Sequence, residues 1–215
     1  MEDNSLKDIW HAQDDKLDKS LKLNLFILDS LQKQKARSKL GSLATFKVWA
    51  VVIGILFILF LAVLIYGNQL KNIFFTVSMS MIMLFTIYAV VVYIKHIILI
   101  KELDYSASIA DTQKKLAELQ SSTISSTGIL LLQLPFYSTW FWSWEMITSN
   151  VQKFWFVAVP CTIVFTAISI WLYKNITEKN MDKKWMKCLF NTGPEYKNIV
   201  QARKFLTELE EFKKG

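Results

Sequence analysis

The feature that most constrains this chain is a run of 19 residues without a charged side chain, at residues 48–66 (VWAVVIGILFILFLAVLIY). As an α-helix, such a run is about 28 Å long, close to the roughly 30 Å of hydrocarbon in a bilayer. A helix that is apolar on every side is typical of a membrane span or of the deep core of a large protein. The run therefore predicts a membrane-spanning helix.

Three further stretches predict additional spans. Residues 73–94 and 154–173 contain 22 and 20 uncharged residues, and the second of these has Trp155 near one end and Trp171 near the other. Tryptophan favours the headgroup level of a bilayer. Residues 129–144 form a shorter uncharged run of 16, about 24 Å as a helix, and include Pro135, which should kink it. A re-entrant or interfacial helix is the alternative for this segment.

Glycine (6) and proline (3) are scarce among the 215 residues, so the chain lacks the turn residues of a β-protein. We predict an all-α integral membrane protein with four transmembrane helices in two hairpins, plus amphipathic cytoplasmic helices. The expected segments are a cytoplasmic amphipathic segment, the first hairpin, a cytoplasmic helical loop, the second hairpin and a basic cytoplasmic tail, at residues 1–45, 46–100, 101–127, 128–173 and 174–215.

The distribution of basic residues predicts the orientation. Of 25 lysines and arginines, only Lys71 and Lys153 lie on the connections within the two hairpins, and the other 23 lie before, between and after the hairpins. Because cytoplasmic loops carry the excess of basic residues, both termini are expected in the cytoplasm. The net charge of +7 then reflects topology and contact with anionic lipid heads of the bilayer, and we expect no direct binding of nucleic acid.

The N-terminal segment carries the candidate partner-binding residues. Leucines recur there at steps of three and four, which places them along one face of a helix. Packing against the chain's own helices or a second copy, binding of a separate cytoplasmic protein, and contact with the membrane surface are the three explanations that we consider. The candidate residues are Leu6, Trp10, Leu17, Leu21, Leu25, Leu28 and Leu31.

Three other cytoplasmic helices are expected. The central one places Leu116 and Leu119 on one face with Ile109, and could pair with the N-terminal stripe. Residues 181–190 are basic and amphipathic, with Trp185 and Leu189 on the apolar side, as in a helix that lies in the membrane interface. The final helix shows one apolar side made of Ile199, Ala202, Leu206 and Leu209.

Chemistry that would indicate an enzyme is missing from the sequence. The spans contain no ionisable Asp, Glu, Lys, Arg or His, which is where a catalytic or proton-conducting membrane protein usually shows its function. The two histidines, His11 and His96, and the two cysteines, Cys161 and Cys188, do not form a metal or redox motif. We therefore expect no catalytic residue, no cofactor and no metal.

An oligomeric channel or a transporter subunit is the alternative to a non-enzymatic regulatory or scaffold protein. Small polar residues within the spans could line a path, although they more often serve as contacts between helices. These residues are Thr76, Ser78, Ser80, Thr86, Gln133, Ser138 and Thr139.

Three stretches, LKDIWHAQD at residues 6–14, LDYSASIADTQKKLAELQ at 103–120 and LLLQLPFYSTWFW at 130–142, carry a resemblance. The chain resembles a family of uncharacterised bacteroidete-type multi-pass inner-membrane proteins that are often encoded beside extracytoplasmic-function sigma factors. The resemblance implies a bacterial inner-membrane location and a regulatory role, such as that of an anti-sigma factor.

Overall fold

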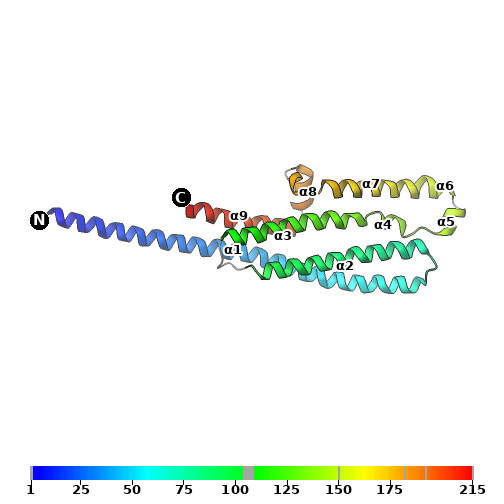
Figure 1. The fold of residues 1–215 in the computed structure, drawn as a ribbon, viewed down its shortest axis with the longest axis horizontal. Coiled ribbons are helices and arrows are strands. Elements are labelled where there is room, and N and C mark those ends of the chain that lie inside the picture. Colours follow the sequence, from blue (N-terminus) through cyan, green and yellow to red (C-terminus); the bar gives the residue numbers. More distant parts are fainter. Residues whose placement is uncertain (1, 104–108, 150, 182, 192, 215) are drawn as a thin grey trace.

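The computed structural model describes residues 2–103, 109–149, 151–181, 183–191 and 193–214. Within these ranges every regular element is helical and no strand occurs. The helices lie side by side in an elongated bundle, and the first helix projects far beyond the others (Figure 1). The predicted all-α fold class is confirmed for this part of the chain.

Helix α1 (Glu2–Asn68) is 67 residues long, which corresponds to about 100 Å. No proline precedes Pro135 in the sequence, so nothing removes a backbone donor within this helix. Residues 1–45 were predicted as a segment separate from the first span, whereas the structure joins both in one helix. The helical periodicity therefore continues without interruption from the apolar run at residues 48–66 into the N-terminal part of α1, which projects beyond the bundle.

Helix α2 (Ile73–Lys101) returns beside α1 and forms the first hairpin. It begins at Asn72, whose Oδ1 accepts hydrogen bonds from two amides of the first turn, including that of Phe74 at 3.0 Å. The two helices approach closely at Gly54, where an added Cβ would lie 2.7 Å from a methyl carbon of Val90. A glycine is therefore needed for this crossing.

The second hairpin begins with a rod that is interrupted near Pro135. The rod consists of α3 (Ile109–Leu130), the 3₁₀ turn η1 (Leu131–Gln133) and α4 (Phe136–Thr139). The predicted central cytoplasmic helix and the start of the predicted third span are thus one continuous helix. The expected interruption at Pro135 is confirmed.

The structure compensates for the donor that Pro135 lacks. The carbonyl of Leu131 would accept from residue 135 in a regular helix. Here it accepts instead from the N–H of Leu134 at 3.2 Å and from the hydroxyl of Ser169 at 2.9 Å. Ser169 is buried in the neighbouring helix α7, so the interruption also holds two helices together.

The chain then turns and returns through a second rod. Its final part is helix α7 (Val159–Asn175), preceded by a π-helical turn that lies just before Pro160. Because Pro160 cannot donate to the carbonyl of Phe156, a local widening of the helix at this point has a covalent cause. The elements between α4 and α7 are α5 (Trp144–Ser149), α6 (Val151–Lys153) and η2 (Phe154–Ala158).

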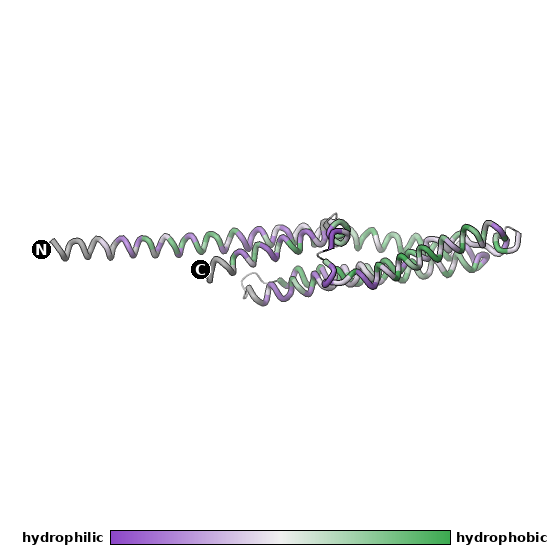
Figure 2. Tube along the Cα trace, turned by 90° about the horizontal axis from the view of Figure 1, so that it is seen from above, coloured by the Kyte–Doolittle hydropathy of each residue, from purple (hydrophilic) through white to green (hydrophobic). Residues whose placement is uncertain are grey.

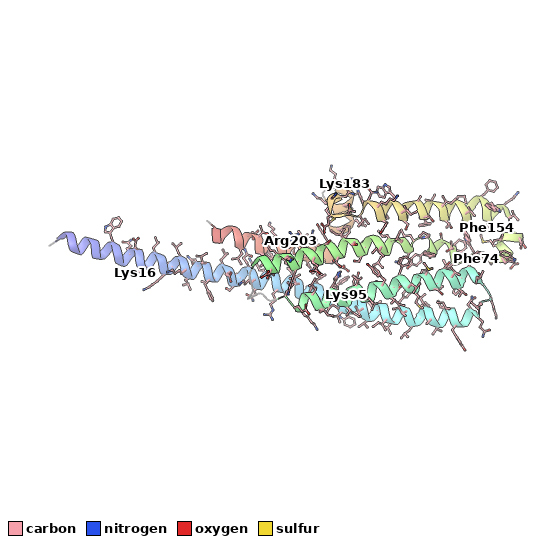
Figure 3. The ribbon with its side chains drawn as sticks, viewed as in Figure 1. Lys16, Phe74, Lys95, Phe154, Lys183 and Arg203 are labelled. Carbon is pink, nitrogen blue, oxygen red and sulfur yellow. The ribbon has the colours of Figure 1, made fainter. Side chains whose placement is uncertain are left out.

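We call the end of the bundle with the connections at residues 67–73 and 140–153 the hairpin end, and the opposite end the tail end. At the hairpin end the amide of Asn72 donates to the carbonyl of Trp142 at 2.6 Å. The ring of Trp142 packs against Phe74 and Phe154, with centroids 5.9 and 5.0 Å away. Figure 3 labels Phe74 and Phe154 at this end. The two hairpins therefore turn at the same level.

Three described helices are long and apolar enough to cross a membrane. They are Lys19–Asn68, Ile73–Lys101 and Phe154–Asn175, and they contain the first, second and fourth predicted spans. Residues 129–144 are not among them, because η1 and Pro135 interrupt their helix. In Figure 2, hydrophobic residues dominate from the middle of the bundle to the hairpin end, whereas α9 and the projecting part of α1 mix both kinds.

The tail end is completed by η3 (Glu178–Asn180), α8 (Lys184–Asn191) and α9 (Pro194–Lys214). Helix α8 packs on the bundle through Met186 and Phe190, which are buried, whereas Leu189 is exposed. Trp185 and Leu189 were predicted on the apolar side of this helix. Trp185 does pack on the bundle, against Trp171 with ring centroids 5.2 Å apart.

Helix α9 covers part of α1 and α3. The predicted apolar side of this helix is confirmed, because Ile199, Ala202, Leu206 and Leu209 are all buried. The central helix α3 contributes Leu116 and Leu119 to the same core, so it does not pair with the N-terminal leucines as considered above. The residues of α1 in this core are Ala36, Leu40 and Leu43.

Candidate functional site

The structure leaves most of the predicted partner-binding residues uncovered. We call residues 10–31 of α1 the projecting stretch. In this stretch Trp10, Leu17 and Leu21 are 72%, 61% and 53% exposed, and Leu31 is 46% exposed. Leu25 and Leu28 are half-buried, and the side chain of Leu6 lies outside the described residues. The chain's own described helices therefore do not cover most of this stripe.

The projecting stretch also exposes apolar side chains that the stripe does not include. Leu23 and Phe26 are 58% and 70% exposed, and Ile27 is exposed as well. On a helical wheel Phe26 lies on the side opposite to Leu17 and Leu28. These residues were not predicted, because the stripe of leucines was sought on a single face of the helix. Their position beside the leucines in the sequence is the signal that could have identified them. The projecting stretch therefore exposes large apolar side chains on two sides of the helix, as surfaces that contact another protein or a membrane do.

Contacts with the C-terminal half of α9 mark where the covered part of α1 begins. The amide of Gln32 in α1 donates to a carboxylate oxygen of Glu208 in α9 at 3.2 Å. The ammonium of Lys35 lies over the ring of Phe205, 5.8 Å from its centroid. From these residues toward the bundle α9 covers α1, and in Figure 3 the projecting stretch, marked by Lys16, extends past the other helices.

A buried ion pair fixes the other end of α9. We call Lys47, Tyr93 and Glu195 the Lys47 cluster. Lys47 has no exposed surface, and its Nζ donates to Oε2 of Glu195 at 2.9 Å. The hydroxyl of Tyr93 donates to Oε1 of the same carboxylate at 2.8 Å, and the Lys47 ammonium lies 4.1 Å from the Tyr93 ring centroid. One carboxylate thus joins α9 to α1 and α2.

The electrostatics of the Lys47 cluster are those of a structural contact. Taking an ammonium out of water costs several kcal/mol unless a partner of opposite charge compensates. Glu195 supplies that charge, and its position in the first turn of α9 is where the helix dipole favours an acidic residue. The aromatic face of Tyr93 adds a cation–π contact to the same ammonium. Both carboxylate oxygens are therefore engaged in holding three helices together.

His96 extends the polar region toward α3. Its side chain is 2% exposed, and Nε2 lies 2.8 Å from the hydroxyl of Ser122, with the Tyr93 ring 6.4 Å away between centroids. Its Nδ1 is buried without a hydrogen-bond partner among the described residues. Among all the residues that the structure describes, no group of three or more His, Cys, Asp or Glu side chains could hold a metal ion.

Sequence reasoning did not find the Lys47 cluster. Lys47 immediately precedes the first uncharged run and was counted only as a basic residue that sets the orientation. A signal was present, because Ala36, Leu40, Leu43 and Lys47 follow one another at helical steps along the face that α9 covers. A lysine on an otherwise buried face needs an acidic partner. The identity of that partner, Glu195, could not be read from the spacing.

Comparisons with models of protein families, with curated proteins and with solved structures find no match to this chain.

Proposed function

We propose that this chain is a non-enzymatic membrane protein, a regulator or scaffold, which binds a cytoplasmic protein through the projecting stretch. The observation that carries the proposal is that the other described helices leave Trp10, Leu17, Leu21 and Phe26 of the projecting stretch exposed. Water-exposed apolar groups of this size on two sides of a helix are costly in a soluble environment and typical of an interaction surface. The family that the chain resembles suggests that the chain regulates a sigma factor, which would then be the cytoplasmic partner.

The membrane part of the proposal is four spans with both termini in the cytoplasm of a bacterial inner membrane. The α3–α4 rod supports the additional span, because it runs beside α2 to the hairpin end (Figure 1). Lys71 and Lys153 are the only basic residues among residues 67–73 and 140–153, whereas the tail end is rich in them. Lys95 and Lys183 lie at one level along the bundle in Figure 3, as expected at a cytoplasmic interface.

A channel or transporter subunit is less well supported by the contacts. Ser78 shares a hydrogen bond with Thr139 at 2.8 Å, and Ser138 donates to Thr162 at 3.0 Å. These bonds join α2 to α4 and α4 to α7. Polar residues that could line a path are thus engaged in packing between helices.

Topology can be tested by cysteine labelling in intact cells after replacement of Cys161 and Cys188 by serine. A membrane-impermeant maleimide should label Glu145→Cys, which lies at the hairpin end, and should leave Lys115→Cys unlabelled until the cells are opened. Labelling of both positions only in opened cells would show that the third segment does not cross.

Partner binding can be tested with a fourfold serine variant of the full chain: Leu17→Ser, Leu21→Ser, Leu23→Ser and Phe26→Ser. The matched control replaces three exposed lysines of the same stretch, Lys16, Lys19 and Lys22, by serine, and so imposes the same helix-propensity change at a similar number of positions. We expect the recovery of a cytoplasmic protein with the tagged chain to fall at least tenfold in the first variant only. Equal recovery from both variants, together with unchanged sigma-dependent transcription, would refute the proposal.

A further inference from the structure

The leucines of the projecting stretch follow the spacing of a coiled-coil seam. Leu17, Leu21, Asn24, Leu28 and Leu31 are separated by steps of four, three, four and three residues. This alternation has a mean of 3.5 residues and keeps the same face turned toward a neighbouring helix. Because α1 is unbroken from Glu2 to Asn68, these residues form one line along it.

The last residues of the line approach the part of α1 that α9 covers. Lys35 would be the next residue in the same alternation, and it already packs over Phe205 of α9. Leu31 is exposed, whereas Gln32 is buried and hydrogen-bonded to Glu208. Helix α9 continues past Glu208 to Lys214, toward the half-buried Leu28, so the uncovered part of the seam is the part from Leu17 to Asn24.

The charges around the seam are compatible with a helix of identical sequence. The positions that flank the seam in a coiled coil are held by Asp18, Ser20, Leu25 and Ile27, which include a single charged residue. The charged residues at the remaining positions are Lys16, Lys19, Lys22 and Asp29, and Asp29 forms an ion pair with Lys33 on that outer side at 3.0 Å. Two copies side by side would therefore bring together apolar side chains without opposing rows of like charge.

We infer that the seam Leu17–Leu21–Asn24–Leu28–Leu31 pairs with the same seam of a second copy of this chain in a parallel two-helix coiled coil. This inference rests on the proposed membrane anchoring, because two copies inserted with the same topology have their projecting stretches on the same side of the membrane. The seam is short, about 20 Å from Leu17 to Leu31. Confinement to one membrane raises the effective concentration of the second helix and compensates for this short length.

Asn24 is the single polar residue of the seam and takes a d position, because it follows Leu21 by three residues. In a parallel pair in register its amide lies opposite the equivalent amide of the second copy. The outer residues Leu23 and Phe26 remain exposed in such a pair. A dimer therefore buries Leu17 and Leu21 in its seam and leaves Leu23 and Phe26 as the apolar surface for the cytoplasmic partner proposed above.

The test is disulfide cross-linking of the full chain in membrane vesicles, with Cys161 and Cys188 replaced by serine. Seam variants are Leu21→Cys and Asn24→Cys, and the matched outer-face controls are Lys19→Cys and Phe26→Cys. We expect cross-linked dimers to form at least tenfold faster at both seam positions than at both controls.

Each other outcome overturns the inference. Equal rates at all four positions would indicate random collision, the absence of cross-links would indicate a monomer, and cross-linking at Asn24 without Leu21 would indicate an antiparallel or shifted pair. As a second measurement in the same vesicles, Leu28→Asp added to Asn24→Cys should slow its cross-linking at least tenfold, whereas Leu23→Asp added to Asn24→Cys should not. An unchanged rate with Leu28→Asp also refutes the pair.

The two proposals fail separately. If seam cross-links are absent while the fourfold serine variant still loses its cytoplasmic protein, the partner proposal stands and the dimer does not. If seam cross-links form while partner recovery is unaffected, the dimer stands and the partner proposal fails.

Discussion

Replacement of Glu195 by leucine should loosen α9 more than any other single change at the tail end. Lys47 is fully buried, whereas the side chain of Glu195 is 19% exposed. Glu195→Leu therefore leaves a buried ammonium without its counter-charge and a Tyr93 hydroxyl without its acceptor. The reverse change, Lys47→Met, leaves a carboxylate that still accepts from Tyr93 and has partial access to water.

The magnitude follows from these two losses. Breaking a buried ion pair by removing one partner costs about 3–5 kcal/mol, and an unsatisfied buried hydroxyl adds about 1–3 kcal/mol. Some relaxation of the lysine toward water reduces the sum, so we expect α9 to open about 3 kcal/mol more easily. Because about 1.4 kcal/mol is a factor of ten, this corresponds to roughly a hundredfold larger open population.

Hydrogen exchange of the detergent-solubilised or nanodisc-embedded protein measures this opening. The amides of residues 199–206 should exchange about a hundredfold faster in Glu195→Leu, while those of α7 should not change. The double variant Lys47→Met with Glu195→Leu has no charge left to bury, so it should recover most of the protection. If Glu195→Leu exchanges within about threefold of the unaltered protein, or if the double variant exchanges as fast as the single one, the Lys47 cluster does not hold α9.

Two further predictions concern packing between the hairpin helices. Gly54→Val should lower the thermal stability clearly, because its Cβ meets Val90 at 2.7 Å, whereas Gly41→Ala has open space around it and should be neutral or stabilising by up to about 1 kcal/mol in a thermal-shift assay. Ser169→Ala removes a donor to the carbonyl of Leu131 and should cost about 1 kcal/mol, and a stability equal to the unaltered protein would show that the N–H of Leu134 alone satisfies that carbonyl.

Local pattern predicted much of the helical structure. The uncharged runs at residues 48–66, 73–94 and 154–173 fall within helices long and apolar enough to cross a membrane, because hydropathy over 20 residues is a property of one segment. The apolar side of α9 was also predictable from the sequence, because Ile199, Ala202 and Leu206 follow the helical period. The interruption at Pro135 follows from the missing N–H of proline.

What the sequence did not predict depends on how distant segments meet. Lys47 and Glu195 are separated by 148 residues, and nothing in either neighbourhood identifies the other as its partner. The same is true of Ser169 and the Leu131 carbonyl. The stripe of leucines was visible, but the part that would stay uncovered was not, because this depends on how far α9 reaches along α1.

That reach is itself explained by the Lys47 cluster. Glu195 fixes the start of α9 at Lys47, and thirteen residues later Glu208 meets Gln32, fifteen residues back along α1. At 1.5 Å per residue these two lengths are about 20 and 22 Å. The two helices therefore run antiparallel and advance by nearly equal lengths between the two contacts. The ion pair and the contact between Gln32 and Glu208 therefore fix the register in which α9 covers α1. Helix α9 continues beyond that contact to Lys214, toward Leu28 and Leu25, which are half-buried, whereas Leu21 and Leu17 are exposed.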